Sequence, residues 1–182
     1  MLASSGPVAA PANAWAFEPK LDGGRVLVSV EGDLTVRTRH GHNVTASVPE
    51  LLPIVTALDG RSVVLDGEPV ARQGRPFDFY SLGPRLSAHA PASVARRRAR
   101  MPVSFAAFDV LYLDGETVTG KPYRERRTLL EGLGLTGAAW CTVLSVVGDG
   151  PELMAACGQL GLEGLVAKRL DSICRPGERS RN

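Results

Sequence analysis

Lysine is scarce in this chain. Of its 21 basic residues only three are lysines, Lys20, Lys121 and Lys168, and the others are arginines. Where positive charge alone is needed, this sequence tends to supply arginine, so each lysine raises the question of a role that arginine cannot fill. Lysine can lose its proton and act as an amine nucleophile, whereas the guanidinium of arginine stays charged. Lys20, in the stretch WAFEPKLDGGRV (15–26), is the leading candidate for such a role.

Cysteine, long apolar runs and net charge are limited too, and each limit excludes a class of protein. The three cysteines are well separated and form no C-x-x-C pair, which argues against a structural zinc site and indicates a reducing compartment. No apolar run approaches the roughly 20 residues that span a bilayer, and the N-terminus lacks the pattern of a signal peptide. The net charge of +2 is too small to indicate nucleic-acid binding by itself. These limits predict a soluble protein of the cytoplasm.

The length and the pattern of short elements predict one domain. With 182 residues the chain is long enough for one sizeable core. Residues 1–14 are small and proline-containing, and we expect them to be an irregular lead-in to a domain over residues 15–182. Short β-like runs outnumber helical ones and are joined by short turns. This predicts an α+β fold with twisted, largely antiparallel sheets flanked by helices.

Local signals predict the individual elements. Residues 25–39 are typical of a hairpin that turns at residues 31–33. Ser47 and Glu50 have capping-box spacing, which predicts a helix over residues 47–58. Residues 62–71 suggest two strand segments that meet at a turn around Asp66-Gly67. The later elements expected are a helix with an arginine-rich loop within 76–101, a buried strand over 103–115, a helix over 123–134, a strand over 138–148, a helix over 151–161 and a strand over 163–170.

Four short segments carry the residues suited to chemistry. They are EPKLDGGR (18–25), LDGEPV (65–70), FDVLYLDG (108–115) and EGLVAKR (163–169). Each alone is a weak signal, because Asp-Gly pairs are ordinary hairpin turns. Together they offer a nucleophile, carboxylates, an aromatic ring and further cations. This set suits nucleotide chemistry, with cations for the phosphates, carboxylates for ribose hydroxyls and Mg²⁺, and an aromatic face for the base.

In order and spacing these segments resemble the adenylation domain of ATP-dependent DNA ligases, members of the covalent nucleotidyltransferase superfamily. The W-x-x-E-x-K approach over residues 15–20 is most similar to bacterial end-joining-type ligases. The matched family motifs are K-x-D-G-x-R at 20–25, D-G-E at 66–68, F-D-x-L-Y-L-D-G at 108–115 and E-G-x-V-x-K at 163–168. The fold that this resemblance implies is the ATP-grasp-like nucleotidyltransferase domain.

The resemblance also implies a mechanism. Lys20 would attack the α-phosphorus of ATP, assisted by Lys168, and form lysyl-AMP. AMP would then pass to the 5′-phosphate of nicked DNA, and the 3′-hydroxyl would displace it. Glu18 would accept a hydrogen bond from the adenine amino group, Phe108 and Val166 would enclose the base, and Arg25 and Glu68 would hold the ribose. The full nucleotide-binding set implied is Glu18, Pro19, Lys20, Arg25, Glu68, Phe108, Val166 and Lys168.

The implied metal and DNA contacts come from other residues. Glu163, alone or with Asp66, is the expected ligand for Mg²⁺ or Mn²⁺, and Arg39 is the expected DNA contact. Val166 and Lys168 differ by two positions, so they share one face of a strand. Glu163 has the opposite parity, and therefore we expect a bulge or twist at Gly164.

The sequence also departs from the family pattern. RPGERSRN reaches Asn182 without the family's W-x-K motif and OB-fold domain, so we expect a catalytic core that reacts slowly with ATP and seals nicks poorly alone. The expected partners are nicked or broken duplex DNA, an OB-fold domain and end-joining proteins, at the nucleoid of a bacterium. Leu82-Gly83-Pro84-Arg85 departs from the family's L-Q-x-R, so no role is assigned to Arg85. ARRRAR (95–100) is interpreted as a solvated loop rather than a DNA contact.

Two alternatives remain open at this stage. The first is another covalent nucleotidyltransferase, an RNA ligase or an mRNA-capping enzyme, because those share K-x-D-G-x-R. The second is a non-catalytic module that binds nucleotide or nicked DNA. Retention of Lys20 argues against the second, because phosphate binding alone could use arginine.

Overall fold

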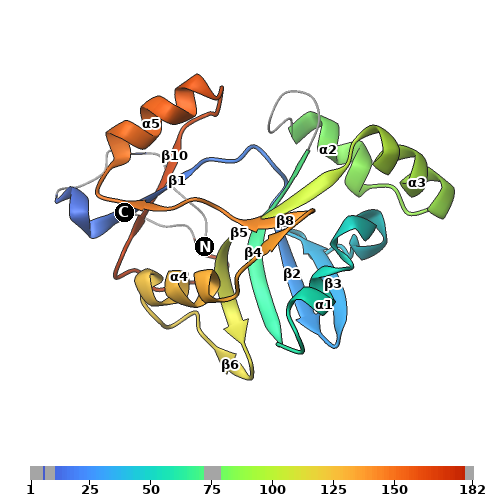
Figure 1. Cartoon of the computed structure of the whole chain (residues 1–182), viewed down its shortest axis with the longest axis horizontal. Coiled ribbons are helices and arrows are strands. Elements are labelled where there is room, and N and C mark those ends of the chain that lie inside the picture. The colour runs from blue at the N-terminus through green and yellow to red at the C-terminus, as the bar shows by residue number, and fades with distance from the viewer. Residues whose placement is uncertain (1–5, 7–10, 72–78, 179–182) are drawn as a thin grey trace.

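The chain folds around two sheets. The structure, a computed structural model, describes residues 6, 11–71 and 79–178. Within these residues there is a three-stranded sheet of order β10-β1-β9 and a seven-stranded sheet of order β3-β2-β4-β5-β8-β7, with β6 on β5. Figure 1 shows the small sheet beside α5 and the large sheet in the centre of the molecule. The expected α+β class with largely antiparallel sheets is confirmed, because β5–β8 is the one parallel pairing in the described chain.

The large sheet contains the predicted hairpin. It is formed by β2 (Val26–Glu31) and β3 (Asp33–Thr38), with Gly32 at φ +74° in the turn. The sheet continues through β4 (Val63–Ala71) and β5 (Val103–Leu113). Short strands complete it: β6 (Glu116–Thr117), β7 (Thr136–Gly137) and β8 (Trp140–Thr142).

The small sheet separates an apolar face from a polar one. Its strands are β1 (Trp15–Pro19), β9 (Val146–Val147) and β10 (Leu165–Arg169). Trp15 and Phe17 pack on Leu153 and Cys157 of α5 (Gly150–Gln159) and form a small core. Because strand side chains alternate, Ala16 and Glu18 lie on the opposite face, away from α5.

The helix expected over residues 47–58 is wrong in its form. The segment makes two 3₁₀ turns, η2 (Thr45–Ser47) and η3 (Pro49–Leu51), followed by the short α1 (Ile54–Ala57). Neither residue of the proposed capping box caps a helix. The Ser47 hydroxyl donates to the Ala88 carbonyl at 2.7 Å, and the Glu50 carboxylate accepts from Arg85 at 2.7 Å. Tertiary partners therefore take both side chains that the local pattern assigned to a cap.

The turn expected at Asp66-Gly67 is also wrong. β4 runs through these residues without interruption, and its register against β5 shifts twice, once between Val64 and Leu65 and once between Asp66 and Gly67. A Cβ at Gly67 would lie 2.4 Å from the Ala106 carbonyl oxygen, so glycine allows the two strands to approach at this point. The Asp-Gly pair marks a β-bulge instead of a hairpin.

Two further expectations are corrected, one about a loop and one about a strand. ARRRAR lies in a helix and not in a loop, because it forms most of α3 (Pro91–Arg100), which follows α2 (Phe79–Leu86). Arginines in its last turn suit the negative end of the helix dipole. Residues 76–78 of the segment 76–101 lie outside the described residues. The strand expected over 138–148 is divided between β8 and β9, which belong to different sheets.

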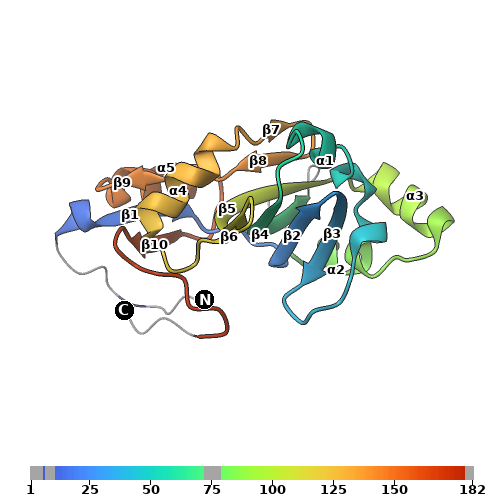
Figure 2. The same ribbon diagram turned by 90° about the horizontal axis from the view of Figure 1, so that it is seen from below.

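The last three expected elements are present. The helix expected over 123–134 is α4 (Tyr123–Gly132), the helix expected over 151–161 is α5, and the strand expected over 163–170 is β10. Figure 2 shows α4 beside both the small-sheet strands and β5. Of the lead-in, the structure describes Gly6, Pro11 and the 3₁₀ turn η1 (Ala12–Ala14), so the proposed boundary at residue 15 stays a prediction. Across the described ranges, no helix has both the length and the apolar character needed to cross a bilayer.

Candidate nucleotide-binding site

The predicted site residues meet where the two sheets adjoin. The Lys168 ammonium, on β10 of the small sheet, donates to the carbonyl oxygen of Phe108, on β5 of the large sheet, at 2.9 Å. The same ammonium lies 4.8 Å from the centroid of the Phe108 ring. One side chain therefore connects two motifs that lie 60 residues apart in the sequence.

The pairing of β1 with β10 arranges the small-sheet residues. Glu18 lies directly opposite Val166, and Lys168 lies opposite Ala16, so Glu18, Val166 and Lys168 share one face. The expected shared face of Val166 and Lys168 is thereby confirmed. Pro19 ends β1, and the Lys20 amide extends the ladder by donating to the Gly164 carbonyl at 2.8 Å.

Glu163 reaches the site through an unusual backbone conformation. Gly164 has φ +155°, which supplies the twist expected before β10 and is open to glycine in particular. With that twist, the Glu163 carboxylate forms an ion pair with the Lys20 ammonium. The two side chains are 58% and 48% exposed, so the pair lies at the open edge of the site.

Glu18 is the buried centre of the site and is only 2% exposed. One carboxylate oxygen, Oε2, accepts from Lys168 at 2.7 Å. The other, Oε1, accepts from the Tyr123 hydroxyl and lies 3.5 Å from Nη1 of Arg127. Tyr123 and Arg127 belong to α4 and were missed by the sequence reasoning, because neither lies in any of the four motifs.

The Phe108 ring lies close to two cations. The guanidinium carbon of Arg25 is 5.8 Å from the ring centroid, and Lys168 contacts the ring as described above. The register shift between Asp66 and Gly67 pairs these residues with Asp109 and Ala107, which leaves Phe108 without a partner on β4. The bulge therefore turns this ring out of the regular pleat, as bulges near active sites commonly do. A half-buried aromatic ring at this point suits stacking on a planar base.

Arg25 and Asp66 form a bidentate pair. The Nε and Nη2 atoms of Arg25 donate to Oδ1 and Oδ2 of Asp66, the first at 2.8 Å, and the Asp66 side chain is 2% exposed. The hydrogen bond to Asp66 raises the pKa of Arg25. Because Asp66 is buried and already neutralised by Arg25, this carboxylate is poorly suited to the metal role suggested for it. In the described part of the chain, no group of three or more His, Cys, Asp or Glu residues is arranged to hold a metal ion.

Glu68 is held by a tight backbone approach. The Gly23 amide donates to its carboxylate at 2.9 Å, and a Cβ at Gly23 would lie 2.5 Å from the Pro69 carbonyl oxygen. This close approach explains why the first motif has a glycine at residue 23. Burial raises the pKa of Glu68 to about 7, although the Gly23 hydrogen bond and the charge of Lys20 oppose the rise.

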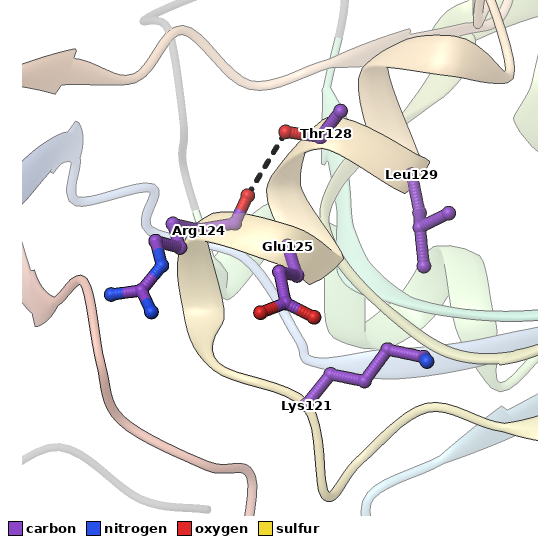
Figure 3. Close-up of a pocket in the computed structure, with 5 residues that line it drawn as sticks. All are labelled: Lys121, Arg124, Glu125, Thr128 and Leu129. Atoms are coloured by element: carbon purple, nitrogen blue, oxygen red, sulfur yellow. Dashed lines mark hydrogen bonds between the residues drawn. The ribbon is translucent and has the colours of Figure 1, made fainter.

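Two hollows lie near these elements, and only one contains predicted site residues. A hollow of about 280 Å³ is lined by Arg25, Asp66 and the exposed Arg39, together with Cys174, Pro176 and Gly177 of the C-terminal segment. A hollow of about 430 Å³ lies along α4 and is lined by Lys121, Arg124, Glu125, Thr128 and Leu129 (Figure 3). The second contains none of the predicted residues, although it is larger, so volume alone is no guide to the site.

Comparison with known proteins matches the whole chain to one family. Residues 1–182 match the family described as the ATP dependent DNA ligase domain. The chain belongs to this family. As a ligase domain, it is 40% identical over 182 residues to the multifunctional non-homologous end joining DNA repair protein LigD of Mycobacterium tuberculosis, with 98% of this chain and 22% of that protein covered. The chain thus spans about a fifth of the length of that relative.

Two further relatives support the assignment. A DNA ligase of Thermococcus onnurineus is 36% identical to this ligase domain over 174 residues, which cover 91% of this chain and 31% of that enzyme. The solved structure of a mycobacterial DNA ligase D complexed with ATP and MES has a TM-score of 0.79 and 37% identity, and the match covers 98% of this chain and 56% of that one. The expected family and fold are confirmed, and the match supports DNA ligase over the RNA-ligase or capping alternative.

Two buried ion pairs in the ligase domain were also missed. Arg126 donates through Nε and Nη2 to Asp109, both at 2.9 Å, and Arg85 donates to both oxygens of Glu50 at 2.7 Å. All four side chains are at most 9% exposed. Asp109 was a possible signal, because a carboxylate beside the buried part of a strand needs a partner.

Proposed function

We propose that this ligase domain catalyses the adenylation of its own Lys20. In this reaction the Lys20 amine, after losing its proton to water, attacks the α-phosphorus of ATP. A P–N bond forms, the bond from the α-phosphorus to the bridging oxygen breaks, and pyrophosphate leaves. The resulting lysyl-AMP then transfers AMP to the 5′-phosphate of nicked DNA, with the lysine amine as leaving group, and the 3′-hydroxyl displaces AMP to join the strands.

The strongest support for this proposal is the register of β1 against β10. In this register Glu18 and Val166, the two residues proposed to contact the base, lie directly opposite one another. Along the strands, Lys20 lies two residues past this pair in one direction and Lys168 lies two residues past it in the other. Phe108 offers an aromatic face from β5 of the large sheet, Glu68 lies on β4 of the same sheet, and Arg25 directly precedes β2, so both are near for the ribose. Lys168 pairs with Glu18 in this structure, so it must leave that carboxylate to approach the α-phosphate.

Glu163 suits the expected divalent metal better than Asp66 does. Mg²⁺ commonly uses one or two carboxylates and completes its coordination with water and substrate phosphates. Glu163 is exposed at the edge of the site and pairs with Lys20, whereas Asp66 is buried and accepts from Arg25 through both of its oxygens. A metal bound there would neutralise charge that develops on the phosphates. We therefore retain Glu163 alone as the metal ligand for Mg²⁺ or Mn²⁺.

The DNA partner is nicked or broken duplex in our proposal. Arg39 is exposed and lines the same hollow as Arg25, which supports a contact with the DNA backbone near the nucleotide. The similarity to LigD supports a role in end-joining repair with an OB-fold domain and end-joining proteins as partners. Such a role on bacterial chromosomal DNA would place the protein in the cytoplasm at the nucleoid.

Intact mass spectrometry tests the proposal directly. The purified chain would be measured before and after incubation with ATP and Mg²⁺, together with Lys20→Ala and with Lys121→Ala as the matched surface control. We expect an acid-labile adduct of the mass of AMP in the wild type and in Lys121→Ala, and none in Lys20→Ala. GTP in place of ATP should give little or no adduct.

Two results would contradict the proposal in different ways. An adduct that persists in Lys20→Ala would exclude Lys20 as the nucleophile. Binding of ATP without any adduct, with Mg²⁺ or with Mn²⁺, would support the non-catalytic module instead.

A further inference from the structure

Helix α4 presents a polar stripe to the site. Its inner residues are Tyr123, Arg126, Arg127 and Leu130, at the spacing that puts side chains on one face of a helix. Leu130 joins the main core and Arg126 pairs with Asp109, so these two anchor the helix. The opposite side carries the hollow of Figure 3. The remaining two inner residues, Tyr123 and Arg127, both reach Glu18.

Tyr123 is a committed hydrogen-bond donor to Glu18. Its side chain is buried, at 1% exposure, and its hydroxyl donates to Oε1 of Glu18. Burial, and then the charge of the Glu18 carboxylate, raise the pKa of Tyr123 well above its usual range, so the phenol keeps its proton. Its ring is also 4.9 Å from the Lys168 ammonium. The hydroxyl lies 3.2 Å from the Ser145 hydroxyl, which can donate to it and complete the chain.

Arg127 is held firmly and points one nitrogen at the same carboxylate. Its Nη2 donates to the Val143 carbonyl at 2.7 Å, and its Nε donates to Glu131 at 2.7 Å. Its side chain is 12% exposed. Nη1 makes no hydrogen bond within the described structure and lies 3.5 Å from Oε1 of Glu18, where it supplies positive charge without a close contact.

These contacts divide the two oxygens of Glu18 between protein and ligand. Oε1 faces Tyr123 and Arg127, whereas Lys168 is the one contact of Oε2 among the residues that the structure describes. A carboxylate oxygen has two lone pairs, so Oε2 can accept a hydrogen bond from a ligand in addition to the one from Lys168. Once Lys168 moves to the phosphate, both lone pairs of Oε2 are open to the ligand. Donors fixed on Oε1 also hold Glu18 as an acceptor. An acceptor favours adenine, which carries an amino donor where guanine carries a carbonyl acceptor.

We propose that Tyr123 and Arg127 are positioning residues that orient Glu18 and thereby set the preference for adenine over guanine nucleotides. This rests on the proposed function, in which Glu18 reads the base. Neither residue contacts the reacting atoms. Their effect is therefore on nucleotide binding and choice, and the rate of the chemical step at saturating ATP changes little.

The first test is Tyr123→Phe, which removes the hydroxyl and keeps the ring. We expect the KM for ATP in lysyl-AMP formation to rise about tenfold, as for loss of one hydrogen bond to a charged group, with kcat within about twofold of the wild type. The preference for ATP over GTP should fall by a similar factor. Tyr112→Phe, a half-buried tyrosine on β5 outside the site, is the matched control and should change none of these values.

The second test compares two substitutions of Arg127. Arg127→Met removes the charge and should raise the KM for ATP about tenfold. Arg127→Lys restores a positive charge and should recover part of that loss. A residue with only a structural role would show loss of folding in both variants, which thermal unfolding measures, and no change in the ratio of ATP to GTP use.

The outcomes separate this inference from the proposed function. If the wild type forms no lysyl-AMP, the proposed function fails. If the wild type forms it and Tyr123→Phe keeps the KM and nucleotide preference of the wild type, the positioning role of Tyr123 is overturned. If Tyr123→Phe does not fold, Arg127→Lys against Arg127→Met decides: equal KM values with unchanged preference overturn the inference, and a graded rise supports it.

Discussion

Two kinds of ion pair in this ligase domain use two different cations. The deeply buried pairs, Arg85–Glu50 and Arg126–Asp109, use arginine, and each guanidinium has further bonds to backbone carbonyls. The pairs at the proposed reaction centre, Lys20–Glu163 and Lys168–Glu18, use lysine and join one nitrogen to one carboxylate oxygen. The third lysine, Lys121, pairs with Glu116 outside the site, and arginines such as Arg61 form surface pairs as well.

The difference follows from the chemistry of the two side chains. A guanidinium has five donors in a rigid plane, so it can satisfy a carboxylate and several carbonyls at once and hold separate elements together. An ammonium on a flexible chain makes a contact that can be exchanged for a phosphate. The buried arginine pairs therefore stabilise the fold, and the lysine pairs at the proposed reaction centre can open for the reaction. Arg25–Asp66 shows that a fixed part of the site also uses arginine.

The largest expected effect comes from Lys20→Arg. This variant keeps the positive charge and removes the amine that can be deprotonated, so the rate of adduct formation should fall by at least about 1000-fold. The measurement is the yield of AMP adduct by mass spectrometry, with Lys121→Arg as the control that should behave as the wild type. Adduct formation by Lys20→Arg at more than a small fraction of the wild-type rate would refute the distinction between the two cations.

The next largest effect is expected from Arg85→Met. Glu50 would then be buried without a cation, so the free energy of unfolding should fall by about 3 kcal/mol. Urea unfolding monitored by circular dichroism measures this loss. The double variant Arg85→Met/Glu50→Leu removes both charges and should recover much of it. A loss below about 1 kcal/mol in the single variant would show that the pair is not a stabilising anchor.

Unlike Arg85→Met, Lys168→Met should lower the rate of adduct formation much more than the free energy of unfolding. Glu18 keeps Tyr123 and Arg127 as partners, so the free energy of unfolding should fall by only about 1 kcal/mol. Loss of a cation at the α-phosphate should slow adduct formation about 100-fold at saturating ATP. Single-turnover kinetics and urea unfolding on the same protein compare the two effects. Large destabilisation with an unchanged rate would assign Lys168 to the fold instead.

The smallest expected effect concerns Glu68 and pH. Its pKa is raised from 4.5 to about 7 in the folded chain, so between these values the folded state binds more protons than the unfolded state. The free energy of unfolding therefore decreases as pH rises through this window because of Glu68. Comparing unfolding at about pH 5 and about pH 8 should show a smaller decrease in Glu68→Gln than in the wild type. An identical decrease would mean that Glu68 titrates normally.

The site residues could be proposed from sequence because they lie in short motifs. K-x-D-G-x-R, F-D-x-L-Y-L-D-G and E-G-x-V-x-K name Lys20, Phe108 and Lys168 without any knowledge of contacts. The partners of those residues could not be proposed in this way. Tyr123 lies 105 residues from Glu18, and no local pattern links them.

The errors in the fold have the same origin. The Asp66-Gly67 pair has the pattern of a turn, and only its pairing with β5 makes it a bulge. Ser47 and Glu50 have the spacing of a cap, and only the buried Arg85 and the Ala88 carbonyl take them elsewhere. Local sequence could not decide these cases, because the competing partners are far away along the chain.

The sequence by itself determined the family and the class of fold, and it predicted the nucleophile and the types of side chain around it, because local patterning and short motifs specify these. The tertiary structure alone decided that Asp66 pairs with Arg25, that Glu18 accepts from a residue of α4, and that Arg85 and Arg126 form buried ion pairs. The physical reason is that a charged group taken out of water must find a partner wherever the fold brings one, at any distance along the chain.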